Sequence, residues 1–146
     1  EVEELGTLSA SFFGLPIWAL DGDAMLYQQR IASETLALML MDSDGDISQI
    51  ATGAAGDIGG LHATDAGFIA TINGELTLIQ PDGTAEVLHE GSVPGWSLTV
   101  RGTHLIFVTL ESDGTSSLWH IDLETMQTTL IGSAYTIVPA VAAATD

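Results

Sequence analysis

The chain has 146 residues, of which 46% are hydrophobic and 15% are charged, a composition typical of one folded domain rather than a disordered segment. Its 20 acidic residues face two arginines, giving a net charge of −18, which disfavours nucleic acid and anionic membranes as partners. Cysteine is absent, which excludes disulfides and thiolate metal sites, and no apolar run reaches the roughly 18 residues of a membrane helix.

The sequence contains a unit that occurs three times in tandem. Residues 21–42 align without gaps on residues 101–122, and residues 65–82 form a shorter copy between them. A repeat of about 40 residues is typical of a β-propeller, in which each unit forms one four-stranded blade.

Residues 1–13 are predicted to form the last strand of a preceding blade, because Glu4-Leu5-Gly6 resembles Leu130-Ile131-Gly132 at the end of the third copy. Residues 14–54 are predicted to form the first blade, with strands at Leu15–Leu20, Met25–Ile31, Thr35–Met41 and Ile47–Ala51.

Read alone, residues 24–41 also suit a helix, because Gln, Arg, Glu, Leu and Met are good helix formers. The aligned residues of the later copy are rich in β-branched and aromatic types, and Ser112-Asp113-Gly114 interrupts them as a hairpin turn would. Since one repeat family should have one structure, strands are preferred here.

Residues 55–91 are predicted to form the second blade. Strands Gly67–Ile72 and Glu75–Gln80 flank Asn73-Gly74, which is the strongest short signal for a β-hairpin. Thr84–His89 is the expected outer strand of this blade.

Residues 92–134 are predicted to form the third blade, and residues 135–146 the first strand of a following one. The predicted strands of the third blade are Trp96–Val100, Leu105–Leu110, Ser116–Ile121 and Thr128–Ile131. The following strand is expected because Val138-Pro139 after Gly132 resembles Val93-Pro94 after Gly91.

The third blade resembles the TolB-like and WD-type propeller repeats, in which a strand, a DG-type turn and an aromatic–x–Ile–Asp strand precede an outer strand. The matching segments are Leu105-Ile106-Phe107, Asp113-Gly114, Leu118-Trp119-His120-Ile121-Asp122 and Thr129-Leu130-Ile131. The Gly-His and Trp-Asp dipeptides of the WD type are absent, and the second blade is shortened.

The resemblance implies an all-β chain that is part of a larger, six- to eight-bladed β-propeller. It would hold about three four-stranded antiparallel blades with flanking strands of adjacent blades. Because a propeller closes with roughly 4–8 blades, we expect further blades from the same precursor or from a partner subunit. The chain begins with Glu1, as a mature or trimmed product would.

Three sets of residues are candidates for binding. Asp42, Asp44 and Asp46 place carboxylates at alternate positions, which suits Ca²⁺ but equally suits a solvated hairpin turn. No other cofactor is expected.

Trp18 and Trp96 belong to predicted inner strands and would either stack on a sugar or pack the channel. Asp21, Asp65 and Arg101 fall near the inner-strand turns at one channel mouth, where Arg101 would recruit an anionic group or form a salt bridge.

The remaining residues show no pattern specific to one chemistry. His62, His89, His104 and His120 lack metal-site spacing, so a structural or surface role is expected for them. Trp119 is expected to be buried in the core of its blade. The sequence contains no G-x-S-x-G motif and no lysine for a Schiff base.

The preferred interpretation is a binding or scaffold propeller, extracellular or periplasmic, that engages a protein or a glycan. One alternative is a hydrolase or lyase whose channel-mouth active site is completed by other chain segments. A second alternative is a structural subunit of an extracellular assembly.

Overall fold

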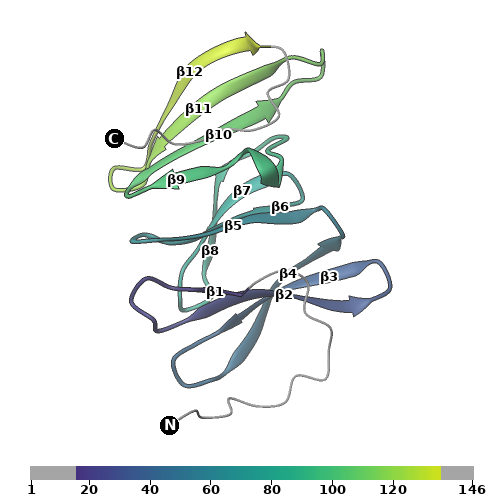
Figure 1. The fold of residues 1–146 in the computed structure, drawn as a ribbon, viewed down its shortest axis with the longest axis vertical. Coiled ribbons are helices and arrows are strands. Elements are labelled where there is room, and N and C mark those ends of the chain that lie inside the picture. The colour runs from purple at the N-terminus through teal and green to yellow at the C-terminus, as the bar shows by residue number, and fades with distance from the viewer. Residues whose placement is uncertain (1–15, 136–146) are drawn as a thin grey trace.

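Three four-stranded antiparallel sheets follow one another along the chain (Figure 1), as predicted. The computed structural model describes residues 16–135, so the flanking strands predicted at 1–13 and after 135 lie outside the described residues. Blade 1 contains β1 (Ile17–Trp18), β2 (Met25–Ala32), β3 (Thr35–Met41) and β4 (Ile47–Ala54). Blade 2 contains β5 (Ile58–Thr64), β6 (Gly67–Ile72), β7 (Glu75–Ile79) and β8 (Ala85–His89). Blade 3 contains β9 (Thr99–Arg101), β10 (His104–Leu110), β11 (Ser116–Asp122) and β12 (Gln127–Tyr135).

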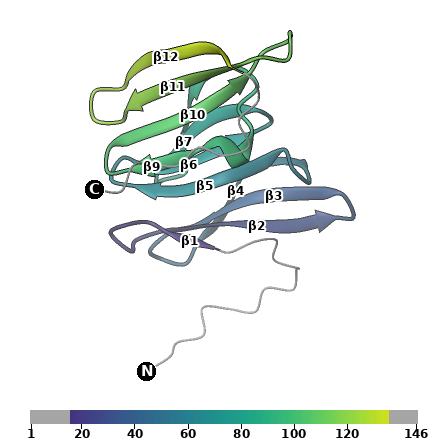
Figure 2. The ribbon, with the colours of Figure 1, turned by 45° about the horizontal axis from the view of Figure 1, so that its top comes forward.

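Within each blade the strands pair in chain order, which gives the stack two distinct ends. The first strands of the blades, β1, β5 and β9, lie side by side along one edge of the stack (Figures 1 and 2). The turns between first and second strands and between third and fourth strands lie at one end, here named the turn end. The turns between second and third strands and the connections from blade to blade lie at the other, here named the crossover end.

The segment with helical composition forms a β-hairpin, which confirms the preference for strands. In this hairpin Met25 pairs with Met41, and Leu26 with Leu40. Leu36, Leu38 and Leu40 alternate along β3 and pack against blade 2. Tertiary packing of this apolar face therefore outweighs the intrinsic helix propensity of the segment.

The second predicted hairpin is also confirmed. Asn73 and Gly74 have φ angles of 53° and 84°, so both central residues take the positive φ that a type I′ turn requires. This turn joins β6 to β7 at the crossover end.

Two details differ from the sequence predictions, and one strand had no predicted range. Trp96 lies in a 3-10 turn, η1 (Gly95–Ser97), rather than in an inner strand, and β9 begins only at Thr99. Tyr135 belongs to β12 rather than to a following strand. The inner strand of blade 2, to which no range was assigned, is β5, whose ladder is interrupted between Gly59 and His62 by a bulge.

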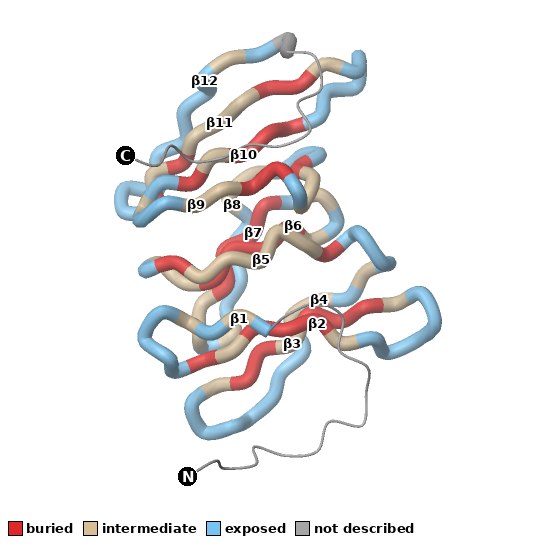
Figure 3. The backbone as a smooth tube through the Cα atoms, in the orientation of Figure 1, coloured by how far each residue is buried: buried red, intermediate tan, exposed pale blue. Residues whose placement is uncertain are grey.

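The blades are joined by two apolar layers. The layer between blades 1 and 2 places Leu26 and Leu38 against Phe68 and Ala70, and the layer between blades 2 and 3 places Leu76 against Leu105 and Phe107. Buried stretches accordingly run through the middle of β2, β3, β6, β7 and β10 (Figure 3). Because β6 contributes to both layers, neither face of the central blade is exposed to water along this strand.

Blades 2 and 3 approach each other backbone to backbone near the channel. A Cβ built on Gly95 would lie 3.0 Å from the Gly60 nitrogen and 3.1 Å from the Gly59 Cα, and a Cβ on Gly60 would collide with the Leu98 side chain. Only residues without a side chain permit this approach. The glycine contact therefore fixes how closely η1 of blade 3 lies on β5 of blade 2.

Among residues 16–135, none of the helical segments is long and apolar enough to span a bilayer. The one short helical segment in this range is the three-residue turn η1.

Gly60 and Gly102 form a matched pair for testing the glycine contact. Both have a φ of +58°, but a Cβ on Gly102 meets no atom within 4 Å. Gly102→Ala should lower the free energy of unfolding by about 1–2 kcal/mol, the cost of a Cβ in the left-handed region. Gly60→Ala should cost about 1–3 kcal/mol more, because its methyl group overpacks the junction. Urea unfolding of both variants measures the difference, and equal losses would contradict the proposed contact.

Candidate functional site

Asp21 and Asp65 come together at the turn end. Both line one surface cavity of about 270 Å³ between blades 1 and 2. Asp65 also lines a second cavity, of about 220 Å³, together with Gly102 and Thr103 of blade 3. Asp65 is therefore shared by two cavities that run along the inner-strand turns.

The other predicted channel residues are more scattered. Arg101 is the last residue of β9 and pairs with His104, so it lies in the strand and not in the turn after it. Trp18 lies in inner strand β1 as predicted, and its side chain is 49% exposed. Trp96, in η1, is 48% exposed. The prediction of an inner-strand position is therefore confirmed for Trp18 and wrong for Trp96.

The loop with three alternating aspartates is closed by its own hydrogen bonds. The backbone N–H groups of Asp44 and Asp46 donate to Asp42 Oδ1 at 3.0 and 2.9 Å, and the Asp42 N–H donates to the Asp46 carbonyl at 3.0 Å. Among the described residues no group of three His, Cys, Asp or Glu side chains is arranged to hold a metal ion. The Asp42 carboxylate thus stabilises the turn between β3 and β4, and calcium binding at this loop stays a prediction.

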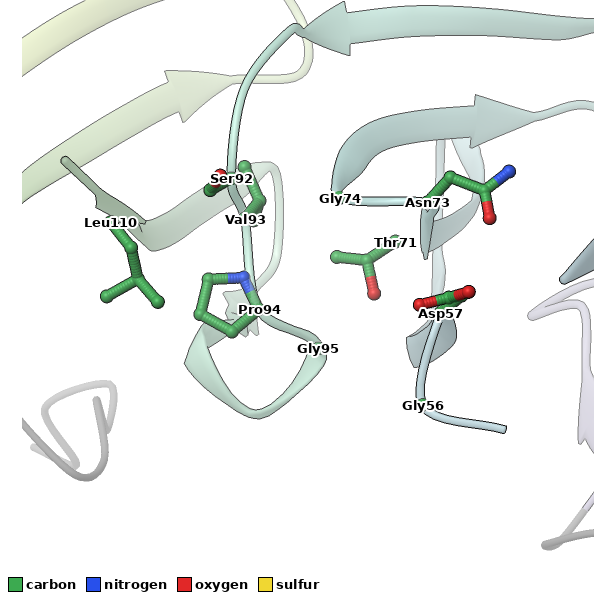
Figure 4. A pocket seen from close by; sticks show the side chains of 10 residues that line it. All are labelled: Gly56, Asp57, Thr71, Asn73, Gly74, Ser92, Val93, Pro94, Gly95 and Leu110. Atoms are coloured by element: carbon green, nitrogen blue, oxygen red, sulfur yellow. The ribbon is translucent and has the colours of Figure 1, made fainter. Parts of the chain in front are cut away.

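A further cavity lies at the crossover end, between blades 2 and 3 (Figure 4). Its volume is about 280 Å³. Three segments that are distant in sequence form it: the connection before β5, the end of β6 with its turn, and the connection from blade 2 to blade 3. Leu110 at the end of β10 completes it. The lining residues are Gly56, Asp57, Thr71, Asn73, Gly74, Ser92, Val93, Pro94, Gly95 and Leu110. This cavity is named the crossover pocket below.

Thr71 lies between Asp57 and the Pro94–Gly95 segment of the crossover pocket (Figure 4). Thr71 is only 3% exposed, and no hydrogen bond joins its hydroxyl to any of residues 16–135. The Gly95 backbone lies directly against it, since a Cβ on Gly95 would be 3.0 Å from Thr71 Oγ1. The hydroxyl oxygen itself is not fully buried, so water in the pocket can reach it, and a ligand that forms a hydrogen bond there would take the place of that water.

Backbone hydrogen bonds hold the walls of the crossover pocket in place. The Asn73 N–H donates to the Asp57 carbonyl at 2.6 Å, and the Val93 N–H donates to the Gly74 carbonyl at 2.9 Å. Asp57 Oδ2 accepts the Ala54 N–H at 3.2 Å, and Asp57 is exposed at the pocket. The pocket is thus built before any ligand arrives.

A histidine pair occurs on the face of blade 3 that is turned away from blade 2. His104 Nδ1 and His120 Nε2 are 3.0 Å apart, so one ring donates a hydrogen bond to the other. The hairpin register explains the pair, because His104 is opposite Asp122, and Ile106 is opposite His120. The hairpin register, counted outward from the Asp113-Gly114 turn, predicts this diagonal pair, whereas metal-site spacing within one strand does not.

His89 belongs to an aromatic cluster between blades 2 and 3. Its ring centroid lies 5.1 Å from that of Phe107 and 4.9 Å from that of Trp119. Trp119 is only partly buried, in contrast to the prediction, and its Nε1–H donates to the Thr109 hydroxyl at 3.0 Å. Burial lowers the pKa of His89 from its ordinary value of 6.5, and the nearby Glu111 charge opposes this in part.

Because the folded state lowers the pKa of His89, the unfolded chain binds the proton more readily at pH values just below 6.5. Stability should therefore decrease as the pH falls from 7.5 to 5.5. His89→Phe keeps an aromatic ring in the cluster without a titrating group, so its decrease should be smaller than that of the wild type. Thermal unfolding of both proteins at the two pH values gives the comparison. Equal losses of Tm would exclude this role for His89.

Comparison with solved structures shows the fold of a TolB-like β-propeller. TolB from Acinetobacter baumannii matches with a TM-score of 0.57 and 18% identity, over 94% of this chain and 36% of that one. A puromycin hydrolase mutant complexed with PGG matches with a TM-score of 0.47 and 18% identity, over 89% and 30% of the two chains. A protein from Lactobacillus plantarum matches with a TM-score of 0.47 and 14% identity, over 88% and 43%.

The chain spans about a third of the length of the TolB chain that it matches. No protein-family model and no curated protein sequence matches it.

Proposed function

We propose that the chain is a section of a β-propeller that binds a protein or a glycan partner at its crossover end. The observation that carries the proposal is the crossover pocket, in which the Thr71 hydroxyl faces a preformed cavity and makes no hydrogen bond to the described residues. A few polar groups placed in a concave, partly apolar site are characteristic of ligand-binding surfaces.

The charge of the chain limits the partners further. A net charge of −18 repels phosphate backbones and anionic lipid surfaces, whereas neutral glycans and basic proteins are compatible with it. Such an acidic chain is suited to an extracellular or periplasmic setting. There, the remaining blades would come from the same precursor or from a partner subunit.

Filling the crossover pocket tests the proposal. Ser92 is exposed and lines the pocket, so Ser92→Tyr should block the entrance and weaken binding about tenfold or more while leaving Tm nearly unchanged. Ser43→Tyr, in an exposed turn of the turn end, is the matched control and should bind like the wild type. Binding is measured by calorimetry, with hits from a panel of glycans and basic peptides as ligands. Unchanged affinity of Ser92→Tyr would argue against this end as the binding surface.

A hydrolase or lyase is the second candidate function, favoured by the two carboxylates that share the turn-end cavity. Its active site would be completed by residues of other chain segments. Here Asp21→Asn and Asp65→Asn should each abolish turnover by the intact protein, and Arg101→Gln should impair it. Assays against glycan and ester substrates measure this, and full activity in all three variants would remove the hypothesis.

A further inference from the structure

The crossover pocket has two chemically different walls. Asp57 and Thr71 supply oxygen atoms on one side, and Pro94 and Leu110 supply carbon atoms on the other (Figure 4). None of the described residues that line the pocket carries a positive charge. The site therefore offers a carboxylate and an unengaged hydroxyl beside an apolar surface.

A ligand that matches both walls is amphipathic and cationic. Lysine and arginine side chains combine an apolar stem with a charged tip that donates several hydrogen bonds. The stem would lie along Pro94 and Leu110, and the tip would donate to Thr71 Oγ1 and to the Asp57 carboxylate. Hydrogen bonds from a cation to a carboxylate are about twice as strong as neutral ones.

Size and charge favour the same ligand. A volume of about 280 Å³ is just below the range of about 300–1,000 Å³ usual for small-molecule sites, so the cavity holds one side chain rather than a folded segment. The net charge of −18 attracts a basic partner over a distance and raises its rate of association.

We propose that the crossover pocket binds a lysine or arginine side chain of a partner protein. The proposal rests on the binding function proposed above and specifies its ligand. A sugar fits less well, because none of the described residues that line the pocket is aromatic and able to stack on a pyranose ring. In addition, the Asn73 amide is directed away from Thr71 (Figure 4).

The test is a titration of the intact chain with matched peptides, followed by NMR of the backbone amides. One peptide is acetyl-Gly-Gly-Lys-Gly-Gly-amide, and its control carries norleucine, which keeps the stem but lacks the charge. The lysine peptide should shift the Gly74 and Gly95 amide signals and bind about tenfold more tightly than the norleucine peptide. Its affinity should fall as the salt concentration rises from 50 to 500 mM, because the pair is near the surface.

Three variants assign the binding to the named groups. Asp57→Asn removes the charge but keeps an oxygen for the Ala54 N–H, and should weaken binding of the lysine peptide about tenfold. Thr71→Val removes the hydroxyl at nearly constant volume and should weaken it about threefold. Asp82→Asn is the control, because Asp82 also accepts a backbone N–H, that of Thr84, but lies at the opposite end of blade 2. It should bind like the wild type.

The outcomes separate this inference from the broader function. Equal affinity for the norleucine peptide, or no effect of Asp57→Asn, would overturn the cationic ligand. Glycan binding in the same pocket without lysine binding would overturn it too, but would leave the binding function intact. If the intact chain bound neither basic peptides nor glycans, both proposals would fail.

Discussion

The close approach of blades 2 and 3 at Gly59, Gly60 and Gly95 is the constraint on which the rest of the structure depends. Because these residues have no side chains, the backbone of η1 comes into contact with the backbone of β5. This contact brings the apolar faces of the two sheets together, with Leu76 packed against Phe107. It also lays the Pro94–Gly95 segment over Thr71, so the same junction that joins two blades creates the crossover pocket.

Much of the fold could be predicted from the sequence, because the repeat supplies information that no single segment contains. The residues of β2 and β3 have helical composition, and only comparison with the later copy identifies them as a hairpin. The errors fall where the repeat is irregular. The inner strand of blade 2 contains Gly59 and Gly60 and was not assigned from the sequence, yet these residues lie in a strand with a bulge. Trp96 was predicted to lie in a strand, yet Pro94 and Gly95 lead into a tight turn.

The candidate site was beyond sequence analysis for a physical reason. Asp57, Thr71 and Ser92 belong to three segments that are unremarkable by themselves, and only the packing of two blades brings them together. Composition alone does not show which of the 20 acidic residues are available to a ligand. Several of them stabilise turns: hydrogen bonds from Thr84 to Asp82, and from Thr115 to Asp113, lower the pKa of each carboxylate. Asp57 also accepts a backbone N–H, that of Ala54, but it differs from these two residues in lining the crossover pocket.

The central claim is that the junction of blades 2 and 3 builds a rigid pocket from surface loops, and amide hydrogen exchange tests it most directly. The Asn73 and Val93 amides are the informative probes, because their hydrogen bonds tie the three loops of the pocket together. If the account is correct, these loop amides exchange as slowly as the amides of Ala70 in the middle of β6. Exchange as fast as that of Gly22 in the exposed β1–β2 turn would show that the loops open independently, and would contradict it.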